Sequence, residues 1–157
     1  MSKSKQIKNA LVTLLSGLEI DGEAAFYAVT DDTSKDFDGS PVVRVLPDFI
    51  ENTKGAMSQN DREVNYQIVV HLPLENIEAI QGQQLDQIYT LTDLILDALD
   101  EGDFGNRLEE IDPSLGTYIM RATRADWDAV DSKGGALIMM VINVAVGYTK
   151  NLEDGLR

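Results

Sequence analysis

The chain contains no cysteine and a single histidine among its 157 residues. Without cysteine, disulfide bridges and thiolate chemistry are excluded, and the redox compartment stays open. Because His71 is alone, the chain cannot supply a pair of imidazoles to zinc, and any Ser-His-Asp triad would have to use this residue. No candidate nucleophile has a recognisable sequence context. We therefore interpret His71 as a partly exposed strand residue.

Positive charge is scarce as well, because 13 Lys and Arg stand against 27 Asp and Glu, giving a net charge of −14. Proteins bind phosphates through Lys and Arg that displace counterions, so this balance argues against nucleic acid as an attractive ligand. It also disfavours anionic membrane surfaces. The excess of negative charge either serves solubility alone, or it marks a surface that lies beside DNA without binding it.

Long hydrophobic runs are absent too. The longest, over residues 136–146, is about half of the ~20 residues that a membrane-spanning helix needs. Three lysines precede an apolar run over residues 10–18, as in a signal peptide, but Thr13 and Ser16 interrupt the run and no small-x-small cleavage site follows. An amphipathic helix explains this segment better.

The motifs of catalysis and metal binding are missing. There is no glycine-rich phosphate loop or dinucleotide fingerprint. The segment Ser34–Gly39 resembles part of a calcium loop, but Ser34 and Val45 occupy the positions where such a loop needs Asp and a bidentate Glu. The carboxylates at residues 31–32 and 109–112 are interpreted as solvated loops, since no cleft is identifiable between them. We expect no catalytic residues, no metal and no cofactor.

Hydrophobic periodicity predicts two helices. The first extends from Ser4 to Leu18, with Ser4 as N-cap and Gly17 near its exit. The second extends from Gln84 to Leu99 and is terminated by Gly102 and Gly105. Its predicted inner face consists of Leu85, Ile88, Tyr89, Thr92, Ile95, Leu96 and Leu99.

Five further segments have the composition of strands: Ala24–Val29, Val42–Leu46, Val64–Leu72, Thr117–Ala125 and Leu137–Tyr148. Apolar residues alternate in the third segment, which points one face at a core, and the fifth is apolar on both faces like a central strand. Pro47 is expected to end the second strand. Trp127 is expected just past the fourth strand, before a loop over Asp128–Gly135.

The resulting order is α-β-β-β-α-β-β, which places the chain in the α+β class. Two helices most economically cover one face of a mixed or antiparallel sheet. We expect a single domain over residues 1–150, followed by a short polar tail over residues 151–157.

The longest predicted connection is a polar loop from Asp48 to Asp61. A structureless loop of this length is usually functional or disordered. Its apolar side chains either fold back onto their own domain or dock into an adjacent subunit, where aromatic and Met anchors are enriched. We predict docking, with an interface to another subunit or to a tail tube that consists of Phe49, Ile50, Lys54, Met57 and Arg62.

With these elements placed, the chain resembles the tail terminator (tail completion) proteins of long-tailed bacteriophages. The resemblance covers most of the chain. It rests on the order of elements, on the Phe37–Leu46 and Arg62–Leu72 strands joined by a charged loop, on the helix Tyr89–Leu99, and on the apolar final strand ending at Tyr148. The acidic loop Asp31–Asp38 is longer than the resemblance leads one to expect and has no assigned role.

The resemblance implies a structural virion subunit, made in the host cytoplasm, with no catalytic residues to carry over. It implies a hexameric ring that caps the tail tube, stops tube polymerisation and joins the tail to the head or neck. The implied partners are further copies of the chain, the tail tube protein and a head-proximal neck or connector protein. DNA would pass through the ring without specific binding, and no membrane is involved.

Two other interpretations stay open. The first is another neck or head-completion protein, a stopper or adaptor, because these are also small acidic ring-formers. The second is a monomeric binding module or small hydrolase, which the lone His71 and the missing motifs disfavour.

Overall fold

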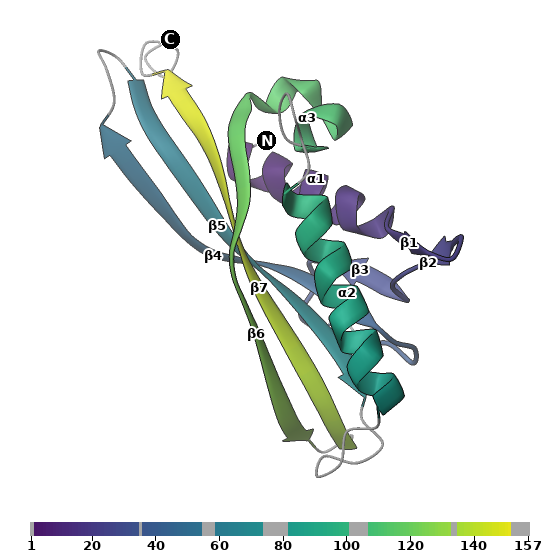
Figure 1. Ribbon diagram of the computed structural model, residues 1–157. Coiled ribbons are helices and arrows are strands. Elements are labelled where there is room, and N and C mark those ends of the chain that lie inside the picture. The colour runs from purple at the N-terminus through teal and green to yellow at the C-terminus, as the bar shows by residue number, and fades with distance from the viewer. Residues whose placement is uncertain are drawn as a thin grey trace.

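A computed structural model of the chain describes residues 2–34, 36–54, 59–73, 82–100, 107–132 and 135–151. Figure 1 shows a long twisted sheet whose helices all lie on one side. The elements are α1 (Lys3–Ser16), β1 (Glu19–Ile20), β2 (Glu23–Ala24), β3 (Ala28–Thr30), β4 (Val42–Lys54), β5 (Gln59–Pro73), α2 (Gly82–Asp100), α3 (Arg107–Ile111), the 3-10 helix η1 (Pro113–Leu115), β6 (Thr117–Ser132) and β7 (Gly135–Asn151). The predicted α+β class is confirmed.

The main sheet has five strands in the order β3-β4-β5-β7-β6, and β1 pairs with β2 in a separate short ribbon. β3 is parallel to β4 over three residue pairs, whereas the other neighbours are antiparallel, so the sheet is mixed. The four strands β4, β5, β7 and β6 alternate in direction across the sheet. Of these four, the two outer strands, β4 and β6, therefore run in opposite directions.

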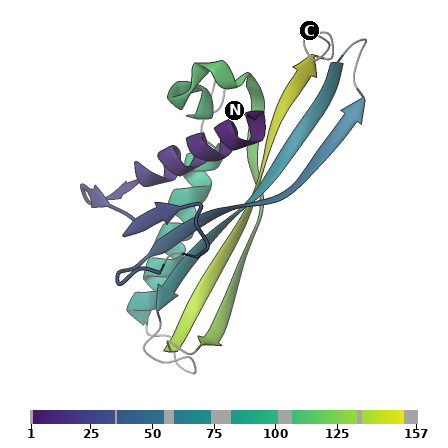
Figure 2. The ribbon, with the colours of Figure 1, turned by 180° about the vertical axis from the view of Figure 1, so that it is seen from behind.

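The core lies between one face of this sheet and the two long helices, which Figure 2 shows on the same side of the sheet. The predicted alternation in β5 is confirmed, because the inward side chains Val64, Tyr66, Ile68, Val70 and Leu72 are all buried. Their partners on β7 are Val146, Val144, Ile142, Met140 and Ile138, which are buried as well. The helices contribute Ile7, Leu11 and Leu15 from α1 and Leu91, Ile95 and Leu99 from α2.

The first helix begins one residue earlier than predicted. Ser2 is the N-cap and not Ser4, because the Ser2 hydroxyl oxygen accepts a hydrogen bond from the backbone N–H of Lys5 at 3.3 Å. Gly17 follows the last helical residue, as expected, and its N–H donates to carbonyls of the final turn.

The predicted inner face of α2 is only partly correct. Leu85 and Tyr89 are exposed, while Leu91 and Ala98, which the prediction omitted, are buried. The buried arc is centred on Ile95, and at 100° per residue it includes positions 91 and 98, whereas position 85 lies about 80° and position 89 about 120° from its centre. Gly102 and Gly105 lie outside the described residues.

Sequence also misplaced the short elements. The predicted strand Ala24–Val29 is divided between β2 and β3, because the backbone N–H of Ala25 donates to the Leu18 carbonyl and that of Tyr27 donates to the Pro41 carbonyl. These two bonds pull the intervening residues out of a ladder. Helices α3 and η1 were not predicted, since elements of five and three residues show no hydrophobic period.

Two of the predicted loops, Asp48–Asp61 and Asp128–Gly135, are mostly strand. β4 continues through Pro47 to Lys54 and β5 already starts at Gln59, while β6 continues through Trp127 to Ser132. Pro47 is tolerated because β4 is an edge strand here and because a bulge follows, with Asp48 skipped between the Pro47–Tyr66 and Phe49–Asn65 pairs. Residues 55–58 and 133–134, and residues 152–157 of the predicted tail, lie outside the described part of the chain.

The position of the core makes a simple prediction. Replacing the fully buried Ile142 by Ala should lower the free energy of unfolding by about 3 kcal/mol, because it deletes methylene groups and leaves a cavity. Ile119→Ala is the matched control on β6, where the side chain is partly exposed on the other sheet face, and should cost less than about 1 kcal/mol. Chemical denaturation followed by circular dichroism measures both, and equal losses would contradict this placement of the core.

Candidate functional site

The most prominent feature of the surface is a three-stranded extension of the sheet. It consists of Phe49–Lys54 of β4, Gln59–Glu63 of β5 and Thr149–Asn151 of β7, which we call the arm. In Figure 1 the arm projects past the helices at the upper left. Every residue of β4 from Pro47 to Lys54 is exposed, because none of the described helices covers this end of the sheet.

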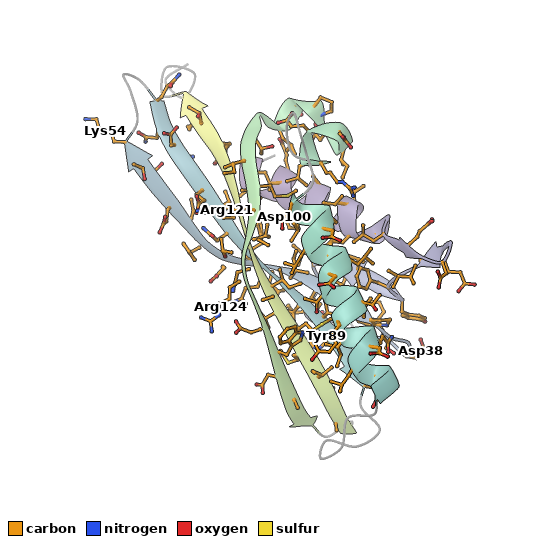
Figure 3. All side chains as sticks on the ribbon, in the orientation of Figure 1. Asp38, Lys54, Tyr89, Asp100, Arg121 and Arg124 are labelled. Atoms are coloured by element: carbon orange, nitrogen blue, oxygen red, sulfur yellow. The ribbon has the colours of Figure 1, made fainter. Side chains whose placement is uncertain are left out.

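Four of the five predicted interface residues lie on the arm. Phe49 and Ile50 are 48% and 53% exposed, and the register places them on opposite faces, since Ile50 pairs with the inward-facing Val64. Lys54 stands at the end of β4, and Figure 3 shows it at the tip. Arg62 lies on β5, and Met57 lies outside the described residues.

The arm is a regular ladder and not a loose loop. Besides its backbone pairs, Arg62 donates through Nε to Asn52 Oδ1 at 3.1 Å, and Thr149 donates through Oγ1 to Asp61 Oδ1 at 3.1 Å. These bonds connect β4 to β5 and β5 to β7 across the exposed sheet. Such a ladder can present side chains to another molecule in a fixed geometry.

A groove of about 650 Å³ lies at the base of the arm, between the N-terminal half of α1 and the sheet. Its sheet side is apolar and includes Val45, Pro47, Ile50, Val64 and Tyr66. Lys5, Lys8, Asp31 and Asp48 surround these residues. The groove combines an apolar surface with charged groups and lies beside β4, which β3 covers only as far as Arg44.

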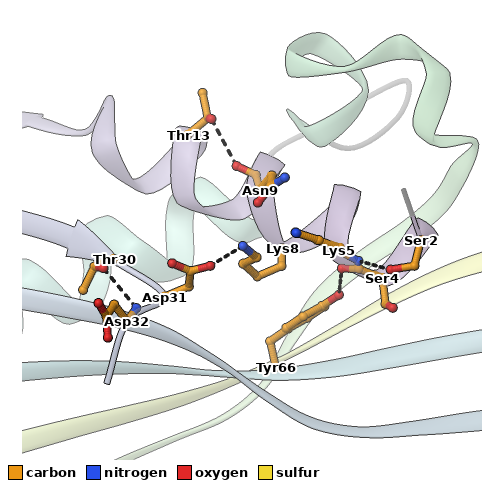
Figure 4. Close-up of polar contacts among 10 residues, drawn as sticks. All are labelled: Ser2, Ser4, Lys5, Lys8, Asn9, Thr13, Thr30, Asp31, Asp32 and Tyr66. Carbon is orange, nitrogen blue, oxygen red and sulfur yellow. Dashed lines mark hydrogen bonds and ion pairs between the residues drawn. The ribbon is translucent and has the colours of Figure 1, made fainter. Parts of the chain in front are cut away.

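Two polar contacts fix the wall of this groove, and Figure 4 shows both. The Tyr66 hydroxyl donates to the backbone carbonyl of Ser4, and burial raises the pKa of Tyr66, so the phenol keeps its proton. Lys8 forms an ion pair with Asp31, which connects α1 to the acidic loop. The hydrogen bond and the charge of Lys8 lower the pKa of Asp31.

A second hollow, of about 360 Å³, lies beside His71. His71 is half-buried on β5, as predicted, and burial followed by the nearby Arg44 guanidinium lowers the pKa of His71. Among the described residues that line the hollow, Asp36 is the one carboxylate, which does not provide the pair that hydrolysis of a glycoside uses. In the described part of the chain no three His, Cys, Asp or Glu residues gather in a way that could hold a metal ion.

An exposed aromatic pair lies at the opposite edge of the sheet. Tyr89 of α2 and Trp127 of β6 are 54% and 49% exposed, and their rings meet edge to face with centroids 6.0 Å apart. Trp127 is held in place because its Nε1–H donates to Thr92 Oγ1 at 3.1 Å. Leu85, one turn before Tyr89, is also exposed. We call Leu85, Tyr89 and Trp127 the ledge; sequence analysis missed it because Tyr89 fits the apolar period of α2 and Trp127 follows a predicted strand end.

Within the described ranges, none of the helices has the length and apolar character needed to span a bilayer. No protein-family model matches the chain, and no curated protein matches it.

Among solved structures, the fold is similar to that of a chain in a structure described as the virion of a native gene transfer agent (GTA) particle, with a TM-score of 0.53 and 13% sequence identity. The similarity covers 89% of this chain and 93% of that chain. The arrangement of helices and strands is therefore shared over nearly the full length of both chains.

The ion pair of the groove gives a prediction on pH. Because its pKa is lowered in the folded protein, Asp31 should contribute stability at neutral pH that is lost as the pH falls through the folded pKa. Lys8→Gln should raise the pKa of Asp31, whereas Lys5→Gln, on the same helix, should leave it nearly unchanged. Side-chain carbon NMR titration of Asp31 measures this, and equal shifts in both variants would contradict the assigned pair.

Proposed function

We propose that this protein is a structural subunit of a virus-like particle that acts as a tail terminator. In this role it forms a hexameric ring, caps the tail tube, stops tube polymerisation and joins the tail to the head or neck. The observation that carries the proposal is the match, over 89% of this chain, to the fold of a chain from a GTA virion. The proposed partners are further copies of the chain, the tail tube protein and a head-proximal neck protein.

The edges of the sheet support assembly into a ring. A closed ring needs head-to-tail contacts between two different surfaces of each copy. The outer strands β4 and β6 run in opposite directions, so a rotation about a common axis brings β4 of one copy antiparallel to β6 of the next. β4 beyond Arg44 has no neighbour on its outer side among the described residues, and an unpaired edge is a template for strand addition.

The arm supports contact with a second component. It presents Phe49, Ile50, Lys54 and Arg62 on a ladder that projects beyond the helices, and Met57 falls between β4 and β5 in the sequence. Exposed aromatic and aliphatic side chains on a fixed strand pair are suited to anchoring in a partner. We propose that these five residues contact a neighbouring subunit or the tail tube.

The charge and the hollows fit a structural role better than an enzymatic one. The net charge of −14 lets DNA pass through a ring without adhering to it. Among the described residues, the hollow beside His71 contains one carboxylate, Asp36, whereas glycoside hydrolysis uses a pair of carboxylates. In this proposal residues 1–150 form one domain that works without a cofactor, away from membranes, in the tail or neck of the particle.

Shortening the arm tests the proposal. Replacing residues 53–61 by Asn-Gly keeps Asn52 opposite Arg62 and closes the strands with a two-residue turn. The variant should remain folded, because the removed residues are outside the core, and should lose at least about tenfold in binding to tail tube ends. Negative-stain microscopy and co-sedimentation with purified tails measure ring formation and binding.

Thr53→Ala is the control, since it keeps the length and ladder of the arm. A shortened variant that forms rings and joins tails like the unmodified protein would contradict the role of the arm. An unmodified protein that binds portal-filled heads and ignores tail tube ends would assign it to the stopper or adaptor class. An unmodified protein that remains monomeric both alone and with tails would overturn the proposed function.

A further inference from the structure

We propose that the ledge of one copy docks into the groove of the next copy, with the aspartates of α2 facing the lysines of α1. This inference rests on the proposed ring and identifies which surfaces hold it together. The ledge consists of Leu85, Tyr89 and Trp127, and the groove lies between α1 and the strands β4 and β5.

The two surfaces lie at opposite edges of the same sheet. Trp127 belongs to the outer strand β6, against which α2 packs. The groove is beside β4 at the other edge, where Pro47 and Ile50 are exposed. Because each copy in a ring turns one edge toward the opposite edge of its neighbour, the ledge and groove of adjacent copies meet.

Their apolar chemistry matches. The ledge presents two aromatic rings about half exposed, held rigidly by their edge-to-face contact and by the Trp127–Thr92 hydrogen bond. Rigid aromatic side chains that enter an apolar recess are the commonest anchors of protein interfaces. The groove offers such a recess, with Pro47, Ile50 and Val64 on its sheet side.

Their charges match as well, because the two long helices carry opposite signs. α1 contains Lys3, Lys5 and Lys8 and no acidic residue, whereas α2 contains four Asp and no basic residue. Asp86, Asp93, Asp97 and Asp100 are all exposed, and their spacing of seven, four and three residues places them on one side of the helix.

This acidic stripe is unfavourable for α2 alone. Asp97 and Asp100 lie in the last turn, where the helix dipole is negative, and no cation on α2 offsets them. Lysines approaching from a neighbouring copy would remove this penalty. Lys5 is exposed beside the groove, whereas Lys8 is paired with Asp31 of its own chain, so Lys5 is the lysine that we assign to a docked α2. The same chain thus supplies both halves of the contact, which favours a second copy as the occupant.

The offset between the two surfaces fits a closed ring. Through the ladder, Trp127 aligns with Met140, Val70 and Val43, whereas Pro47 and Ile50 align with Tyr66 and Val64. This difference of four to six pairs amounts to about 13–20 Å along the strands. Closing a sheet with strands tilted 35–45° staggers each four-strand unit by about 13–19 Å, so a neighbour displaced by this amount brings Trp127 to Pro47 and Ile50.

Charge reversal tests the contact on the full chain. Lys5→Glu and Asp93→Lys should each weaken ring formation about tenfold, because each brings like charges together at every contact. The double variant, with both substitutions, should recover to within about threefold of the unmodified protein. Glu23→Lys on β2 is the control for the charge change and should have little effect. Sedimentation velocity over a concentration series measures the association.

A second set of variants tests the apolar part. Ile50→Asp in the groove and Leu85→Asp on the ledge should each weaken ring formation by at least about tenfold. Ile111→Asp is the control, since Ile111 is similarly exposed on α3 and belongs to neither surface. Circular dichroism verifies that each variant is folded.

The outcomes separate this inference from the proposed function. If the charge pair shows no recovery and the apolar variants assemble normally while the unmodified protein still caps tails, the docking proposal is wrong and the function stands. If the ledge variants form normal rings but no longer join tails, the ledge binds another protein and not a second copy of this chain. That result would also overturn the docking proposal. An unmodified protein that forms no ring, alone or with tails, would overturn both.

Discussion

Burial of one face of β5 and β7 beneath two helices is the interaction on which the rest of the structure depends. Ile68, Val70, Ile142 and Val144 are essentially inaccessible to solvent, so a slip of one residue would turn this whole apolar set outward. The core therefore fixes the register of both central strands. Through the ladder it also fixes which residues of β4 and β6 face the helices, including those far from the core.

The surfaces proposed for assembly follow from that register. The arm is the continuation of β4, β5 and β7 beyond the reach of the helices, and its pairing is inherited from the buried part of the same strands. The groove exists because α1 packs against β3 and β4 and leaves β4 uncovered past the bulge that follows Pro47. The ledge exists because α2 packs beside β6 and leaves Tyr89 and Trp127 at the sheet edge.

Sequence predicted the parts of the fold in which one face is buried. The periods of Val64–Leu72 and of both long helices carry that information, and the order of the elements followed from them. Prediction from the sequence failed where both faces of a strand are exposed, because such a strand has no hydrophobic period. The arm is exposed along β4, so its polar residues resembled a loop, and Pro47 suggested a strand end although an edge bulge accommodates it. Four of the five candidate interface residues thus lie on a strand pair and not in a loop, and the ledge, which depends on how α2 is rotated, was missed.

The position of the arm at one end of the sheet has a consequence for a ring generated by rotation alone. Every copy then presents its arm toward the same end of the assembly, and the opposite end carries the last residues of β6, the first residues of β7 and the start of α2 instead. The two ends of such a disc are chemically unlike. A disc with two unlike ends can seat on a filament in only one orientation, and the end left outward offers a different surface to the next component.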